Sequence, residues 1–157
     1  KFTIAFCSQK LILLSTMDSL LPFDHQLYSL YMDDMNNSQG FYITPSEDGS
    51  ALVAGVRPVA GDHSGDDHRE RAERAARFAV DEHNKTAAGE KDLLEFHGIM
   101  NLNWQPTVCA MYYITMQATD SDGEPAYYEA KVWEKLSSGY KVELFRPAPY
   151  CLKRIGN

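Results

Sequence analysis

The stretch over residues 66–84 constrains this chain more than any other part of its sequence. Small side chains recur on one side of a helix drawn through it, and Val80 widens the stripe. The stripe consists of Ala72, Ala75, Ala76, Ala79 and His83. Asp66 and Asp67 suit the positive end of the helix dipole, and Asn84 suits the left-handed conformation that ends a helix. The pattern predicts one long helix that packs closely through a narrow face of alanines.

Strand-like segments flank this helix, each with a period of two. A short strand is expected around Gly55–Val59, and further strands are expected over about 94–104, 113–118, 128–135 and 140–145. One expected buried face carries Leu94, Phe96, Gly98, Met100, Leu102 and Trp104, and the others carry Ile114, Met116 and Ala118, then Tyr128, Ala130 and Val132. An antiparallel sheet of four to five strands wrapped around one long helix is an α+β fold.

The first fifty residues differ from the rest. The length of 157 residues predicts one domain, which we place at 51–157, with 1–50 as an N-terminal extension. Turn-forming and acidic residues over 33–50 predict a flexible linker. Before it, Phe23, Leu27, Leu30 and Tyr31 fall at helical spacing. Two interpretations stay open: a short amphipathic helix that docks on the domain or on a partner, and a weakly ordered tail.

Composition narrows the classes of function. The net charge of −7 and the pI near 5.1 argue against nucleic acid as a partner, because phosphates require clustered Lys and Arg. No run approaches the roughly 20 apolar residues that span a bilayer, so no membrane partner is expected. Three cysteines without metal-type spacing favour a reducing compartment. We therefore expect a cytoplasmic protein, with secretion left open because residues 4–14 resemble the remnant of a signal peptide.

Motifs for chemistry are missing from the sequence. The segment 62–68 holds the only dense set of potential metal ligands, and we expect those side chains to cap a helix rather than bind zinc. His97 and Cys109 are expected to lie too far apart along one hairpin for nucleophilic catalysis. P-loop, G-x-S-x-G, H-E-x-x-H and G-x-G-x-x-G patterns do not occur. We expect neither an enzyme nor a cofactor.

Four blocks of sequence resemble one family. The stretch Ala76–Asn84 is similar to the helix signature of the plant cystatins, which inhibit papain-like cysteine proteases. Leu-Glu-Phe at 94–96, Gln105, Tyr-Tyr-x-Thr at 112–115 and Tyr-Glu-Ala-Lys-Val-Trp-Glu-Lys at 128–135 follow in the order of that family. The resemblance runs from about Gly55 to Phe145. It implies the cystatin fold and inhibition by a non-covalent wedge.

The resemblance also implies which residues enter the protease cleft. The family uses a glycine in the N-terminal segment, a first hairpin of the form Gln-x-Val-x-Gly and a second hairpin with Pro-Trp. The corresponding residues are Gly55, then Gln105, Pro106, Thr107, Val108 and Cys109, then Leu136 and Ser137. In the first hairpin only Gln105 is unchanged. Cys109 replaces a glycine of the kind that often supplies a positive φ, and Leu136–Ser137 lacks the aromatic anchor.

Two functions therefore remain open. The chain is either an inhibitor that is weakened or retargeted, or a non-inhibitory protein–protein interaction module on a cystatin scaffold. For the second function, an aromatic patch on the open face of the sheet would bind another protein: Trp104, Tyr113, Tyr127 and Trp133. Alternatively, neighbouring strands and the N-terminal segment cover these rings. Trp104 is expected to pack on the sheet rather than to replace the missing anchor.

Overall fold

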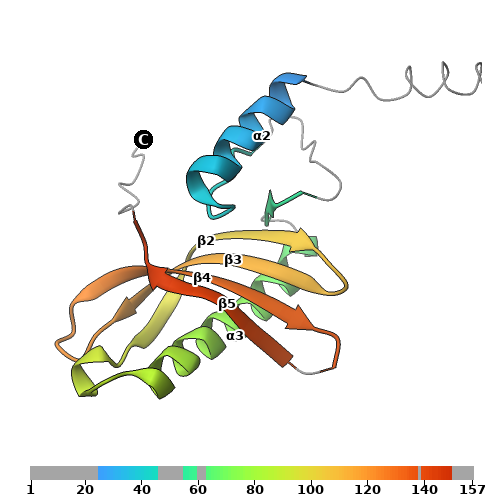
Figure 1. Ribbon diagram of the computed structural model, residues 1–157. Coiled ribbons are helices and arrows are strands. Elements are labelled where there is room, and N and C mark those ends of the chain that lie inside the picture. Colours follow the sequence, from blue (N-terminus) through green and yellow to red (C-terminus); the bar gives the residue numbers. More distant parts are fainter. Residues whose placement is uncertain (1–24, 46–54, 60–62, 138, 150–157) are drawn as a thin grey trace, which may run out of the picture.

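The computed structural model describes residues 25–45, 55–59, 63–137 and 139–149. Its elements are α2 (His25–Ser38), β1 (Arg57–Pro58), α3 (His63–Thr86), the 3-10 turn η1 (Glu90–Asp92), β2 (Glu95–Pro106), β3 (Ala110–Thr119), β4 (Pro125–Lys135) and β5 (Gly139–Pro147). All strands pair antiparallel in the order β1-β2-β3-β4-β5. Figure 1 shows α3 crossing one face of this sheet and α2 lying on the opposite side. The predicted α+β, cystatin-like fold is confirmed.

Helix α3 packs on the sheet through the predicted alanine stripe. Ala72, Ala75, Ala76 and Ala79 are fully buried, and Val80 is buried beside them. Side chains this small bring the helix backbone close to the sheet, where Tyr112, Ile114, Met116 and Val132 fill the core. The apolar patterns predicted for β3 and β4 are confirmed, since Ile114, Met116, Ala118, Ala130 and Val132 are fully buried.

The C-terminal end of α3 differs from the prediction. The helix continues two residues beyond Asn84, to Thr86, so Asn84 does not terminate it. Its side-chain amide instead donates to the carbonyl of Leu94 and accepts the Leu94 N–H, both at 2.9 Å. Asn84 therefore ties the helix end to the residue that precedes β2.

Strand β2 breaks the predicted alternation. Its register with β3 shifts twice, between Phe96 and Gly98 and again between Ile99 and Asn101. Each shift inserts a residue and reverses the facing of those that follow. As a result Ile99 packs against the core, whereas Met100, predicted to be buried, is 50% exposed.

The outer face of the sheet, opposite α3, is covered by the chain's own N-terminal segment. Helix α2 extends to Ser38, and residues 39–45 lie against the sheet. The predicted flexible linker over 33–50 is therefore wrong for 33–45, and 46–50 lie outside the described residues. Phe41 and Ile43 are buried in a second apolar cluster with Val56 and Tyr113. We call α2 with residues 39–45 the outer cover.

Two asparagines of β2 hold this outer cover in register. The Asn103 amide donates to the Gly40 carbonyl at 2.9 Å, and the Asn101 amide donates to the Phe41 carbonyl at 2.7 Å. At the far edge, Arg146 donates to the Gln39 side chain at 2.9 Å. Asn103 is almost fully buried. Paired, buried amides of this kind specify one arrangement, because an unpaired amide there would lose its hydrogen bonds to water.

The outer cover can pack on the sheet in this way only with a glycine at position 40. Its φ is +90°, and a Cβ added to it would lie 2.8 Å from Cε1 of Tyr113. The Tyr113 ring has little room to move, because Phe41 packs edge-on against it and its hydroxyl donates to Gln105. No L side chain fits at this position without displacing a buried ring.

We expect Gly40→Ala to be more destabilising than Gly123→Ala. Gly123 also has a positive φ, +79°, but nothing lies within 4 Å of the position that a Cβ would take there. Gly123→Ala should cost about 1–2 kcal/mol from backbone strain alone, and overpacking against Tyr113 should add about 1–3 kcal/mol at Gly40. Urea unfolding of the two variants measures the difference. Equal losses would contradict the close packing of Gly40 on Tyr113.

The fragment 51–157 is expected to fold with reduced stability. The core under α3 draws on residues from Val59 onward, so the fragment retains it, whereas Phe41 and Ile43 are lost from the outer face. Burial of two such side chains contributes about 3–6 kcal/mol. Circular dichroism during urea unfolding, compared with the full chain, measures this loss. A fragment without cooperative unfolding would show that the outer cover is needed for folding, against the predicted boundary near residue 50.

Candidate functional site

Three segments of the chain meet at one end of the sheet. Arg57 in β1 pairs with Trp104, just before the β2–β3 hairpin that closes at the Pro106–Ala110 pair. Ala110 pairs in turn with Glu134, next to the β4–β5 hairpin. In Figure 1 both hairpins project from this same end. The antiparallel ladder therefore brings together the three segments that the resemblance assigned to the wedge, and we call this end the loop end.

The first hairpin presents an apolar tip. Thr107 and Val108 are exposed, and the Val108 side chain is 79% exposed. Cys109 is half-buried and carries a free thiol. Among non-glycine residues of the described chain, only Gln39 has a positive φ. Cys109 therefore fits the loop without backbone strain, because this hairpin does not use the positive φ that a glycine often supplies.

The second hairpin presents a similar tip. Leu136 is 78% exposed and Ser137 is also exposed. Gly139 has a positive φ of +75°, whereas Leu136 and Ser137 do not. On the family resemblance Leu136 takes the place of the aromatic anchor, and it has less apolar area than a tryptophan.

The N-terminal edge lies beside the first hairpin. Gly55 is half-buried at a bend, and Val56 is buried in the outer cluster. The Val56 N–H donates to the Tyr31 hydroxyl at 3.1 Å. Val59 donates to the Leu102 carbonyl at 3.1 Å. This edge is therefore bound to β2 on one side and to α2 on the other.

Trp104 supports the loop end from the α3 side of the sheet. Its ring stacks on His68 with centroids 3.9 Å apart, and the Arg57 guanidinium lies 4.4 Å from the ring centroid. Trp104 therefore packs on the sheet as expected and is not available as an anchor. It pairs with Tyr112 and so lies on the face opposite Tyr113, which means that it cannot belong to an outer-face patch.

A charged brace joins α3 to the second hairpin. Arg71 donates to both carboxylate oxygens of Glu134, at 3.1 and 2.5 Å, and Tyr112 donates to Glu134 at 3.4 Å. The hydrogen bond to Glu134 raises the pKa of Arg71, and burial first, then the Glu134 charge, raises the pKa of Tyr112. Bidentate pairs of this type fix geometry as well as charge. The brace orients β4 two residues before the exposed Leu136.

The proposed aromatic patch is not continuous. Tyr113 is buried under Phe41 of the outer cover. Tyr127 and Trp133 share the outer face of β4 but are separated by Glu129 and Lys131, about 20 Å along a strand. The Trp133 ring is half-buried, with its Nε1 buried and unpaired. The N-terminal segment therefore covers Tyr113, as the alternative interpretation expected.

Sequence reasoning missed the contribution of residues 31–45 to this region. Tyr31 was placed on a helix but not connected to Val56, and Phe41 and Ile43 fell in the supposed linker. The spacing of two between Phe41 and Ile43 was the available signal, because apolar residues at alternate positions indicate an extended segment with one buried face.

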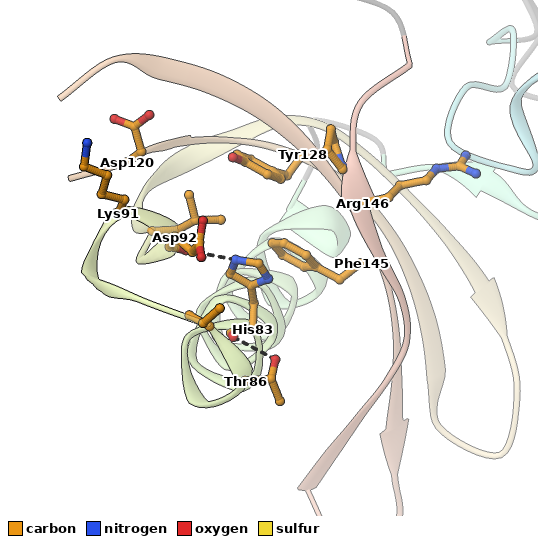
Figure 2. Close-up of a pocket in the computed structure, with 12 residues that line it drawn as sticks. His83, Thr86, Lys91, Asp92, Asp120, Tyr128, Phe145 and Arg146 are labelled. Carbon is orange, nitrogen blue, oxygen red and sulfur yellow. Dashed lines mark hydrogen bonds between the residues drawn. The ribbon is translucent and has the colours of Figure 1, made fainter. Parts of the chain in front are cut away.

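A hollow of about 470 Å³ lies at the other end of the sheet. Figure 2 shows His83 between the Asp92 carbonyl, which lies 3.1 Å from Nε2, and the Phe145 ring, stacked at 4.8 Å between centroids. Tyr128 stacks on Phe145 in turn. Within the described residues no three His, Cys, Asp or Glu side chains converge as metal ligands. No helix of the described chain is long and apolar enough to cross a membrane.

Comparison with known proteins agrees with the fold. A family model described as "aspartic acid proteinase inhibitor" matches residues 66–146. Cysteine proteinase inhibitor A of Helianthus annuus is 47% identical over 73 residues, 46% of this chain and 84% of the relative. Cysteine proteinase inhibitor 1 of Oryza sativa subsp. japonica is 37% identical over 103 residues, 65% of this chain and 67% of the relative. Cysteine proteinase inhibitor 6 of Arabidopsis thaliana is 39% identical over 100 residues, 62% of this chain and 39% of the relative.

The chain belongs to the plant cystatin family, whose members in this comparison are named as cysteine proteinase inhibitors or as cystatins. The matched segment begins in α3 and ends in β5, so it contains both hairpins of the loop end. The outer cover lies before it. The family resemblance is thereby confirmed.

His68 is expected to make stability depend on pH. Burial first, then Arg71 and Arg57, lower its pKa below the usual 6.5, against the opposing effect of Asp67 and Glu134. The unfolded chain therefore binds the proton more readily than the native protein does, and stability falls as the pH drops from about 7 to about 5.

The matched variant is His68→Gln, which retains a polar group near the Tyr112 hydroxyl and does not titrate in this range. The unfolding free energy of the parent chain minus that of this variant should fall steadily from pH 7 to pH 5, measured by urea unfolding at each pH. A difference that stays constant would contradict the lowered pKa of His68.

Proposed function

We propose that this protein inhibits papain-like cysteine proteases by occupying the active-site cleft with its loop end. The observation that carries the proposal is the pair of exposed apolar tips, Val108 and Leu136, on neighbouring hairpins beside the Gly55 edge. On this proposal the protein catalyses no reaction. It excludes substrate by filling the cleft, and its partner is the protease.

The physical basis is a preorganised interface. Hairpins held by β2, β3, β4 and β5 lose little conformational freedom on binding, and a small number of apolar anchors supply most of the affinity. The Arg71–Glu134 brace and the Trp104 stack support the two hairpins from the α3 side of the sheet. The tips contribute their apolar area without any rearrangement of the sheet.

The same residues support weak inhibition of papain-like enzymes. Leucine at position 136 buries less area than the aromatic anchor of the family, and Gln105, the unchanged residue of the first hairpin, already accepts a hydrogen bond from Tyr113 at 3.1 Å. We therefore propose inhibition in the micromolar range or weaker. Cys109→Gly is not expected to improve it, since the loop needs no positive φ at this position.

A second candidate is inhibition of an aspartic protease. It is favoured by one observation, that the family model covering α3 to β5 is described as an aspartic acid proteinase inhibitor. Altered hairpin tips on an intact scaffold are what a change of target would require. The non-inhibitory interaction module is the remaining alternative, but the outer cover leaves less of the outer face open to another protein.

We expect a titration against papain and pepsin to separate these functions. Leu136→Ser and Val108→Asp should weaken the inhibition of the true target several-fold or more. Leu93→Ser is the matched control, because Leu93 is 42% exposed and lies beyond the loop end, before β2. Leu136→Pro combined with Ser137→Trp should improve papain inhibition about thirty-fold, as a buried tryptophan anchor contributes ~2 kcal/mol.

Nanomolar inhibition of papain by the parent chain would contradict the weakened wedge. Inhibition of pepsin alone, sensitive to Leu136→Ser, would establish the second candidate instead. If the parent chain and the Pro-Trp variant inhibit neither protease at micromolar concentration, the inhibitor function is refuted and the interaction module is favoured.

A further inference from the structure

We propose that α2 acts as a clamp on the N-terminal edge of the wedge, with Tyr31 as the positioning residue. This inference rests on the proposed function and names the part of the chain that aligns Gly55 for the protease. Its central contact is the hydrogen bond from the Val56 N–H to the Tyr31 hydroxyl, 3.1 Å long.

The edge needs such a contact because β1 is very short. Only Arg57 and Pro58 pair with β2, opposite Trp104 and Asn103. Two pairs make a weak ladder, and the backbone before them has no further strand partner in the described chain. Val56 is buried, so its N–H cannot donate a hydrogen bond to water. The Tyr31 hydroxyl satisfies that donor and holds the residue directly after Gly55.

The residues that follow α2, Gly40 and Phe41, are held on the sheet independently of Tyr31. Asn101 and Asn103 hold the carbonyls of Phe41 and Gly40, and the Arg146 guanidinium lies over the Phe41 ring at 5.5 Å while it pairs with Glu129. Removing the Tyr31 hydroxyl therefore leaves α2 docked.

The Tyr31 ring packs against the outer cluster beside Met35, one turn further along α2. The position of the hydroxyl is thus determined by β2 and β5, the same strands that carry the hairpins. The sheet carries the two hairpins directly, and through α2 it also aligns the Gly55 edge. An edge that is already ordered loses less conformational freedom when it binds.

Tyr31→Phe tests the clamp, because it removes only the hydroxyl and retains the ring. Hydrogen exchange measured by NMR should show faster exchange of the Val56 amide, by about five-fold or more, the net value of one hydrogen bond. The Val59 amide, bonded to Leu102, serves as the internal reference and should be unchanged. The inhibition constant for the protease identified by the titration should rise by about five-fold.

Asp34→Ala is the matched control. The Asp34 carboxylate accepts the Thr44 N–H at 2.7 Å, so this variant also removes one hydrogen bond of the outer cover, but one made to Thr44 and not to Val56. It should lower the melting temperature about as much as Tyr31→Phe does, while the Val56 amide and the inhibition constant stay at their parent values. If both variants instead raise the Val56 exchange rate and the inhibition constant alike, the outer cover has loosened as a whole, and the specific role of Tyr31 is overturned.

Unchanged exchange of the Val56 amide in Tyr31→Phe would overturn the clamp itself. Faster exchange with an unchanged inhibition constant would overturn its positioning role. A parent chain that inhibits no protease, combined with the faster Val56 exchange in Tyr31→Phe, would refute the proposed function and keep the clamp as a structural contact. The two failures are therefore distinguishable.

Discussion

The close approach of α3 to the sheet is the constraint on which the rest of the structure depends. Four alanines with no exposed surface let the helix backbone lie against Tyr112, Ile114 and Met116. Packing at this distance tolerates no added volume, so it determines the position of the helix along its whole length. The Arg71–Glu134 pair, the His68–Trp104 stack and the Asn84–Leu94 bridge all require that position, and together they relate the helix to the loop end and to the far end of the sheet.

The outer face of the sheet distinguishes this chain from a scaffold that consists of one sheet and one helix. A sheet with one helix leaves its second face to solvent or to a partner. Here the outer cover occupies that face around Tyr113, with carbonyls of Gly40 and Phe41 held by two asparagines of β2. The described residues thus form two apolar clusters, one on each side of the sheet, and the loop end receives support from both.

Much of the fold and the candidate site followed from local patterns. The alanine stripe predicted α3, and period-two alternation predicted β3 and β4. Prediction failed where a pattern was interrupted or displaced. Two register shifts in β2 exchanged Met100 for Ile99 in the core, and the turn-rich composition of 33–50 concealed the buried Phe41 and Ile43. Cys109 replaces a glycine of a kind that often supplies a positive φ, but no positive φ is needed there.

The sequence by itself determined the family, the single long helix and the chain segments that form the two hairpins, because these depend on periodicity and on order along the chain. Only the tertiary structure decided that Gly55, Val108 and Leu136 lie at one end, that Trp104 faces α3, and that Tyr31 reaches Val56. These contacts join residues far apart in sequence. Their geometry depends on bulges, strand register and the closeness of packing, which no local pattern contains.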